Sequence, residues 1–152
     1  MHWADAIARG IVGKRGEKDE YVIEGGIAPS ARKHIGSFRE IVTGFLIKKS
    51  LEKLGKNVRF IYSWDSFDRL KKVSASIPQE KRKELEDYIG VPQGLIPDPF
   101  GCHESYADHF EEFVEKEAEK IGVKPEFIYE DREFMNCTYW ELIVKVMQEK
   151  EK

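Results

Sequence analysis

The apolar residues of the chain follow two alternating spacings, one typical of helices and one typical of β-strands. The helical spacing predicts three helices, with apolar faces made of Trp3, Ile7 and Ile11; of Ile35, Phe38, Ile41, Val42, Phe45, Leu46 and Leu51; and of Tyr106, Phe110, Phe113, Val114 and Ile121. A glycine stands where each helix is expected to end, at residues 13–16, at Gly55 and at Gly122. Short runs of branched and aromatic residues predict strands over residues 21–23, 58–64 and 127–129, the first of which is expected to stop at Gly25 and Gly26.

Two pairs of polar residues resemble the capping box that opens a helix. Ser105 with Asp108 precedes the third helix, and Thr138 with Glu141 would open a further helix close to the end of the sequence. This last helix would carry one apolar side, formed by Tyr139, Ile143, Val146 and Met147.

Helices and strands alternate along the chain, apart from one long irregular insert at about residues 65–103. The insert is broken by Pro78, Pro92, Pro97 and Pro99 and holds one charged, helical stretch, and a connection of this length is usually functional or inserted. Strands that alternate with helices imply right-handed crossovers and a parallel sheet. We therefore expect a single α/β domain over residues 1–152, half of a Rossmann-like fold, with a three-stranded parallel sheet whose open edge could support self-association.

The composition is that of a soluble globular protein. The chain has 152 residues, of which 41% are hydrophobic and 35% charged, and no apolar run approaches the ~20 residues of a membrane-spanning helix. The amino terminus lacks the pattern of a secretory signal, so the cytoplasm is the expected location, with no membrane partner. A net charge of −3 does not indicate a strongly basic, nucleic-acid-binding domain.

The cysteines do not form a recognisable metal motif. Cys102 and Cys137 occur without a CxxC pair, and His109 falls on the helix that follows His103. We therefore expect no metal site, reduced thiols, and a structural loop at residues 102–103.

The segment after the first strand is the strongest candidate for a ligand site. In an open α/β sheet, ligands bind beyond the carboxyl ends of the strands, where helix-start amides face an anion. Here Gly26 would permit close approach of a ligand, Pro29 would stiffen the loop, and His34 and Gly36 would stand at the start of the long helix, with Arg32 and Lys33 adding positive charge. The segment fits neither a Walker A loop nor a GxGxxG fingerprint.

The four residues His34-Ile35-Gly36-Ser37 resemble the HIGH signature of class I aminoacyl-tRNA synthetases, preceded by the usual Pro29-Ser30. Further segments are similar to class I lysyl-tRNA synthetase of the archaeal type: residues 2–5, 38–40, Trp64-Asp65, Lys72-Val73, Tyr106-Ala107 and His109-Phe110. The strongest similarity is the block at residues 97–105, which contains Asp98, Cys102, His103 and Ser105. The chain resembles the N-terminal part of that family's catalytic domain, a Rossmann-like (HUP-type) nucleotide-binding half-domain.

This resemblance implies an activity and a set of residues. The family activates lysine with ATP, accompanied by Mg²⁺, to lysyl-adenylate and transfers the lysyl group to lysine tRNA, which would be bound through parts that this chain lacks. The resemblance implies catalytic roles for His34, Gly36 and Ser37, ATP contacts from Pro29, Ser30, His34 and Gly36, and lysine contacts from Gly26, Ala28, Asp65 and His103.

Three positions depart from the family pattern. Ala28 replaces a threonine, Ala31 a glycine and Ser66 a second acid, so we expect weakened lysine affinity. The second class I signature, KMSKS, does not occur in the sequence. The alternative is therefore a free-standing, synthetase-like module that binds ATP or an amino acid without aminoacylation activity.

Overall fold

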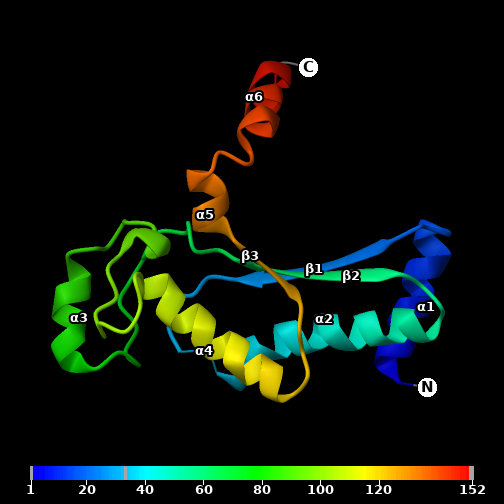
Figure 1. Ribbon diagram of the computed structural model, residues 1–152, viewed down its shortest axis with the longest axis horizontal. Helices are drawn as coiled ribbons and strands as arrows, with labels where there is room; N and C mark the ends of the chain where they lie inside the picture. Colours follow the sequence, from blue (N-terminus) through cyan, green and yellow to red (C-terminus); the bar gives the residue numbers. More distant parts are fainter. Residues whose placement is uncertain (1, 33, 151–152) are drawn as a thin grey trace.

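In the computed structural model, which describes residues 2–32 and 34–150, a parallel three-stranded sheet is flanked by helices (Figure 1). The elements, in chain order, are α1 (Trp3–Arg15), β1 (Tyr21–Ile27), α2 (Ile35–Lys53), β2 (Val58–Trp64), α3 (Gln79–Glu86), the 3-10 helix η1 (Gln93–Leu95), α4 (Tyr106–Lys120), β3 (Glu126–Tyr129), α5 (Glu130–Met135) and α6 (Trp140–Glu149). The predicted α/β architecture is thus confirmed. Lys33, expected to add charge to the loop before α2, lies outside the described residues.

The strands are ordered β1-β2-β3, and both pairs are parallel. Figure 1 shows α2 and α4 on the same side of the sheet. This is the result of two crossovers of the same hand. Between the sheet and these helices lies the main core, formed by Ile41, Phe60, Tyr62, Trp64, Val114, Ala118 and Val123. β1 and β3 are the two edge strands of this sheet, and self-association at an edge stays a prediction.

The end of β1 was predicted incorrectly, because the strand continues through both glycines to Ile27. Gly26 pairs with Ser63 of β2, and a Cβ atom on Gly26 would lie 2.8 Å from the Ser63 carbonyl oxygen. The absence of a side chain therefore lets the two strands come together. The sequence pattern did not show this, since glycine ordinarily weakens a strand.

The C-terminal ends of α2 and α4 lie where the sequence predicts them. Gly55 and Gly122 have φ of +74° and +76° and directly follow the last helical turns, as expected for C-terminal caps. The predicted capping box of α4 is confirmed, with Ser105 and Asp108 bonded in both directions. Ile121 was expected to face inward but is 54% exposed, because it lies at the C-cap, beyond the buried face of the helix.

The region of residues 65–103 folds around an apolar cluster of its own. This cluster contains Leu70, Ile77, Leu85 and Ile96 and includes Tyr106 and Phe110 from α4. The helical stretch is confirmed as α3, whereas η1 was not predicted. The insert is therefore an ordered lobe that packs against the start of α4.

The predicted last helix is present as α6, but its predicted start was wrong. Thr138 does not cap α6, which begins at Trp140 with no side-chain cap bond, and a short helix, α5, precedes it. Cys137 has φ of 57°, and this turn separates the two helices. The apolar side of α6 is exposed, and Figure 1 shows α6 pointing away from the sheet. Among the described residues, no helix is long and apolar enough to cross a membrane.

Candidate functional site

The loop after β1 ends at His34, which is the N-cap residue of α2. The His34 Nδ1 atom accepts a hydrogen bond of 3.0 Å from the backbone N–H of Gly36. A ring nitrogen that accepts must be unprotonated, so in the neutral ring the proton is on Nε2, which can donate to a ligand. A Cβ atom on Gly36 would lie 2.9 Å from His34 Cε1, so this glycine makes room for the histidine ring. Ser37 lies in the same first turn and donates its backbone N–H to the His34 carbonyl at 3.0 Å.

A cavity of about 410 Å³ lies between the middle of β1 and the part of α2 from Gly36 to Ile47. Its charged lining residues are Glu24, Glu40 and Arg39, so the acids outnumber the base by two to one, and Gly25 and Gly36 also line it. A Glu40 Oε1 atom accepts a hydrogen bond from the backbone N–H of Gly26 at 3.3 Å. This acidic cavity suits a ligand with a positive charge, and Glu40 is a residue that the sequence argument did not single out as a ligand contact.

A second cavity, of about 560 Å³, is lined by the loop after β1. Ala28, Ser30 and Ala31 form one side, while Arg69, Lys71, Lys72 and Gln93 belong to the other. The loop therefore lines the basic cavity, whereas the acidic cavity is lined by β1 and α2, the elements that the loop connects. Pro29, expected to stiffen the loop, is fully buried.

The remaining predicted lysine contacts are spread over different places. Asp65 follows β2 and donates its backbone N–H to the Ile27 carbonyl at 3.2 Å, so it lies beside the loop. Ser66 is fully buried, and its hydroxyl donates to Asp131 at 2.6 Å. The serine that replaces the family's second acid therefore links the segment after β2 to α5. His103 lines neither the acidic nor the basic cavity.

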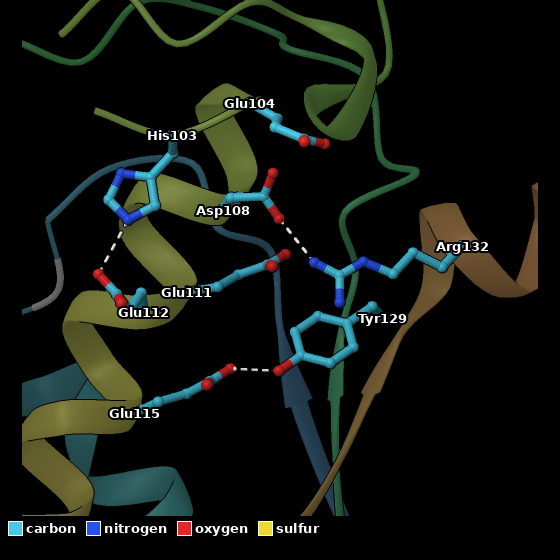
Figure 2. A pocket seen from close by; sticks show the side chains of 8 residues that line it. All are labelled: His103, Glu104, Asp108, Glu111, Glu112, Glu115, Tyr129 and Arg132. Atoms are coloured by element: carbon cyan, nitrogen blue, oxygen red, sulfur yellow. Dashed lines mark hydrogen bonds and ion pairs between the residues drawn. The ribbon is translucent and has the colours of Figure 1, made fainter. Parts of the chain in front are cut away.

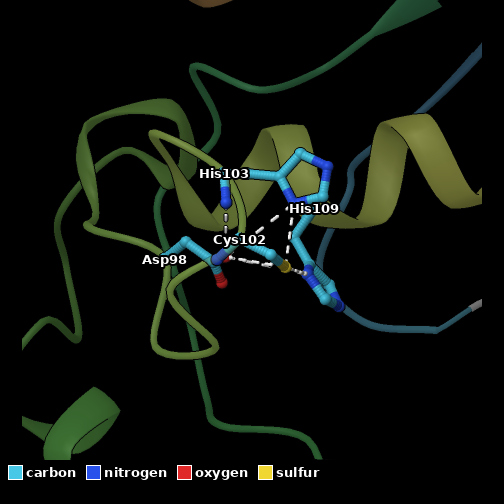
Figure 3. Close-up of side chains that lie close together, drawn as sticks. All are labelled: Asp98, Cys102, His103 and His109. Carbon is cyan, nitrogen blue, oxygen red and sulfur yellow. Dashed lines mark hydrogen bonds and ion pairs between the residues drawn. The ribbon is translucent and has the colours of Figure 1, made fainter.

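His103 instead belongs to a cluster with Asp98, Cys102 and His109 (Figure 3). One potential ligand atom from each residue lies within 4.8 Å of the others, and the Cys102 Sγ atom is 3.1 Å from His103 Nδ1 and 3.2 Å from His109 Nδ1. The expectation that no further donors approach Cys102 and His103 is therefore wrong. His109 is in the first turn of α4, and the fold places its ring next to Cys102 in the preceding loop. Sequence spacing alone did not reveal this proximity.

The donor types in this cluster fit a transition metal. One thiol, two imidazoles and one carboxylate match the ligands that tetrahedral Zn²⁺ takes in proteins. The second ring nitrogen of His103 lies 2.9 Å from Glu112 Oε2, an arrangement that fixes the orientation of a ligating histidine. The Asp98 carboxylate accepts hydrogen bonds from the backbone N–H groups of Phe100, Cys102 and His103.

These contacts and burial determine how the cluster is protonated in the absence of a metal. Burial acts to raise the pKa of Asp98, but the backbone hydrogen bonds outweigh it and hold the pKa below its ordinary value. Burial lowers the pKa of His109, which favours the neutral ring that a metal needs. Burial, followed by Asp98, raises the pKa of the Cys102 thiol, an effect that a bound cation would reverse.

A third cavity, of about 390 Å³, lies between α4 and the end of β3. Figure 2 shows Asp108, Glu111 and Glu115 projecting from α4 towards Tyr129 and Arg132. Glu115 accepts hydrogen bonds from Tyr129 at 3.0 Å and from Trp64 at 2.9 Å. The Trp64 ring is fully buried in the core.

Glu111 is the unusual member of this cavity. It is 2% exposed, and its Oε1 atom has no hydrogen-bond partner among the described residues. Burial, followed by the charges of Asp131 and Asp108, raises the pKa of Glu111 to about 8. Sequence reasoning missed this residue because an acid on a charged helix resembles a solvated position.

Comparison with known families matches residues 1–152 to the family described as tRNA synthetases class I (K). The chain is 43% identical over 152 residues to a lysine–tRNA ligase of Pyrococcus horikoshii, and the match covers all of this chain and 28% of that protein. It is 36% identical over 152 residues to the lysine–tRNA ligase of Methanocaldococcus jannaschii, again covering 28% of that protein. With the lysine–tRNA ligase of Treponema pallidum the identity is 37% over 139 residues, or 91% of this chain and 26% of the relative.

The chain therefore spans little more than a quarter of the length of these relatives. The family match extends over its whole length, including the His34 helix start and the Asp98 to His109 cluster. The resemblance found in the sequence is thus confirmed, and the chain belongs to the family of class I tRNA synthetases (K).

Proposed function

We propose that this chain supplies the HIGH-motif part of a lysine–tRNA ligase, which activates lysine with ATP and transfers it to lysine tRNA. The observation that supports this most directly is the position of His34 as the N-cap of α2, at the end of the loop that follows the first strand of the parallel sheet. The names of the relatives favour this function over a free-standing binding module.

ATP would bind at the loop and the start of α2. Helix-start amides and the positive end of the helix dipole favour phosphate groups there. The His34 Nε2–H would donate to the triphosphate, and Ser30, Gly36 and Ser37 would complete the ATP site, while the buried Pro29 would support the loop without contacting the nucleotide. Mg²⁺ would accompany the nucleotide, and tRNA would be held mainly by parts outside this chain.

Lysine would bind at Gly26 and Asp65, next to the acidic cavity between β1 and α2. Its side-chain ammonium carries a positive charge, and Glu40 is held beside Gly26 by the 3.3 Å hydrogen bond. Ala28 remains a proposed contact to the other end of lysine, although it also lines the basic cavity. His103, which the resemblance assigned to lysine, is better accounted for by the cluster with Cys102.

Calorimetric titration of ATP and of lysine tests these assignments on the same preparation. His34→Ala should weaken ATP binding, and Glu40→Gln should weaken lysine binding about tenfold or more, because a charge-assisted hydrogen bond is worth ~1.5–3 kcal/mol. Glu80→Gln in α3 removes an equal charge from an exposed position outside the site and serves as the control. Unchanged affinities in both site variants would contradict the proposal.

We propose in addition that Asp98, Cys102, His103 and His109 bind Zn²⁺, which would hold the insert against α4. The support is the convergence of four suitable donors from a loop and a helix, with Glu112 behind His103. Metal analysis of the purified chain should find about one zinc per chain, and Cys102→Ala should lose it with a fall in thermal stability. Cys137→Ala is the matched control, and a chain that binds no Zn²⁺ or Co²⁺ would contradict this assignment.

A further inference from the structure

The 560 Å³ cavity on the basic side of the loop has a concentrated positive charge. Arg69, Lys71 and Lys72 line it, in a chain whose net charge is −3. Asp68 also lines the cavity, so the basic residues outnumber the acidic one. Such a local excess of cations attracts an anionic ligand independently of the overall charge of the protein.

Gln93 gives this cavity a second polar feature. It is 2% exposed, and its Nε2 atom donates to the Asp68 carbonyl at 3.2 Å. A backbone carbonyl can only accept, so the Gln93 atom that faces it must be the amide nitrogen Nε2. The second polar atom of the Gln93 side chain is then the carbonyl oxygen Oε1. No donor among the described residues reaches Oε1. A buried acceptor without a partner is costly, so a ligand that brings an O–H or N–H group into the cavity would be favoured.

The basic segment is held in place before any ligand arrives. Leu70 donates its backbone N–H to Val91 at 2.9 Å and accepts one from Gly90 at 2.9 Å, while Gln93 donates to Asp68 at 3.0 Å. Leu70 is also buried in the core of the insert. A preformed surface loses less conformational entropy on binding than a flexible loop would.

We propose that this cavity receives the 3′-terminal nucleotides of the tRNA acceptor strand. Arg69, Lys71 and Lys72 contact the phosphates, and Gln93 Oε1 accepts from a ribose hydroxyl or a base amine. The inference rests on the proposed function, in which ATP and lysine occupy the His34 and Glu40 side of the loop. Ala28 and Ser30 line the basic cavity, so a strand bound there reaches the loop from the opposite side.

A second group of basic residues in the same lobe lies outside this cavity. Lys81 and Lys83 are on α3, the charged helical stretch of the insert. Neither residue lines the basic cavity. A double substitution at these two positions therefore removes the same charge from the same lobe without touching the proposed RNA contacts.

The test measures binding of a short single-stranded RNA ending in CCA to the 152-residue chain by fluorescence anisotropy at several salt concentrations. Lys71→Gln with Lys72→Gln should weaken binding about tenfold at low salt and reduce the slope of log affinity against log salt by about 1.4, since each phosphate contact on a single strand contributes about 0.7. Lys81→Gln with Lys83→Gln should leave both quantities unchanged. Gln93→Met should weaken binding while leaving the salt slope unchanged, because it removes an acceptor and no charge.

Three outcomes would overturn the inference: no binding of the RNA, equal loss in the two lysine double variants, or a loss of ATP affinity in place of RNA affinity when Lys71 and Lys72 are changed. The last outcome would make the cavity part of the ATP site. The proposed function is tested separately, because it fails if His34→Ala leaves ATP binding unchanged, whatever the RNA result.

Discussion

The hydroxyl of Tyr106 donates a hydrogen bond to the backbone carbonyl of Ser30, so the first residue of α4 is joined to the loop after β1. The Tyr106 side chain is fully buried, and burial raises its pKa to about 12, which keeps the hydroxyl protonated as a donor. The proposed nucleotide loop is thereby fixed to the lobe that carries the Asp98 cluster.

Tyr106→Phe should weaken ATP binding without unfolding the chain. The change removes one hydroxyl and leaves the buried ring, and a neutral hydrogen bond contributes ~0.5–1.5 kcal/mol, or about two- to tenfold in affinity. Calorimetry with ATP measures the effect. Tyr139→Phe, which removes the bond of 3.2 Å to Glu130 outside the loop, should leave ATP binding unchanged. Equal effects of the two substitutions would argue against a specific role of the Tyr106 bond.

Gly36→Ala should displace the His34 ring. The new Cβ atom would lie 2.9 Å from Cε1 and 3.0 Å from Nδ1, so the ring must move and its cap bond to the Gly36 N–H is weakened. We expect a loss of stability of ~1 kcal/mol from the cap, measured by urea unfolding, together with weaker ATP binding. Gly10→Ala in α1 has open space around it and should stabilise the chain by up to ~1 kcal/mol.

Gly26→Ala and Gly25→Ala should differ although the positions are adjacent. A Cβ atom at Gly26 would meet the Ser63 backbone oxygen at 2.8 Å, whereas at Gly25 the nearest atom belongs to the Tyr62 ring at 3.5 Å, an ordinary contact. We expect Gly26→Ala to lower the free energy of unfolding by ~1–3 kcal/mol and Gly25→Ala to have little effect. If both were tolerated equally, the close approach of β1 and β2 would be incorrect.

Glu111→Gln should change how stability depends on pH. The folded chain keeps the Glu111 proton up to about pH 8, whereas the unfolded chain releases it near the ordinary value of 4.5. Between these values the unfolded state binds fewer protons, so stability falls as pH rises and levels off above about pH 8.

The neutral amide of the variant removes this loss. Glu111→Gln should therefore be the more stable protein at pH 8.5, by up to ~5 kcal/mol, and similar to the parent at pH 4.5, as followed by denaturant unfolding. Glu117→Gln, an exposed acid paired with Lys120, should show no comparable pH effect. A parallel pH profile for the parent and Glu111→Gln would show that the carboxyl is not buried as described.

The strands of the sheet could be predicted from the sequence more reliably than the loops. β2 is a continuous run of branched and aromatic residues, and it was predicted with its bounds intact because a strand with most side chains buried has that pattern. The capping box at Ser105 was equally clear, since it depends on residues three positions apart. Gly26 was misinterpreted because its role depends on Ser63, which is distant in sequence.

The candidate site was predictable only where local sequence carries its geometry. His34 and Gly36 were found because helix-start chemistry is short-range, and the family resemblance supplied their roles. Glu40 was named only as part of the family resemblance. Its place beside Gly26, which suggests a ligand contact, became apparent only from the folded structure. Likewise, Asp98 and His109 meet Cys102 only after the insert has folded onto α4. Thr138 matched a capping box but does not form one, because the turn at Cys137 moves the helix start to Trp140.

The position of the insert between β2 and β3 has a consequence for the order in which the chain folds. Parallel pairing of β1 with β2 requires closure of a loop that contains only α2, whereas pairing of β2 with β3 requires closure of a loop that contains the whole lobe and α4. Longer loops cost more entropy to close, and non-local pairing slows folding. The β1–α2–β2 unit is therefore expected to gain hydrogen-exchange protection first, and β3 to join the sheet only after residues 65–125 have collapsed.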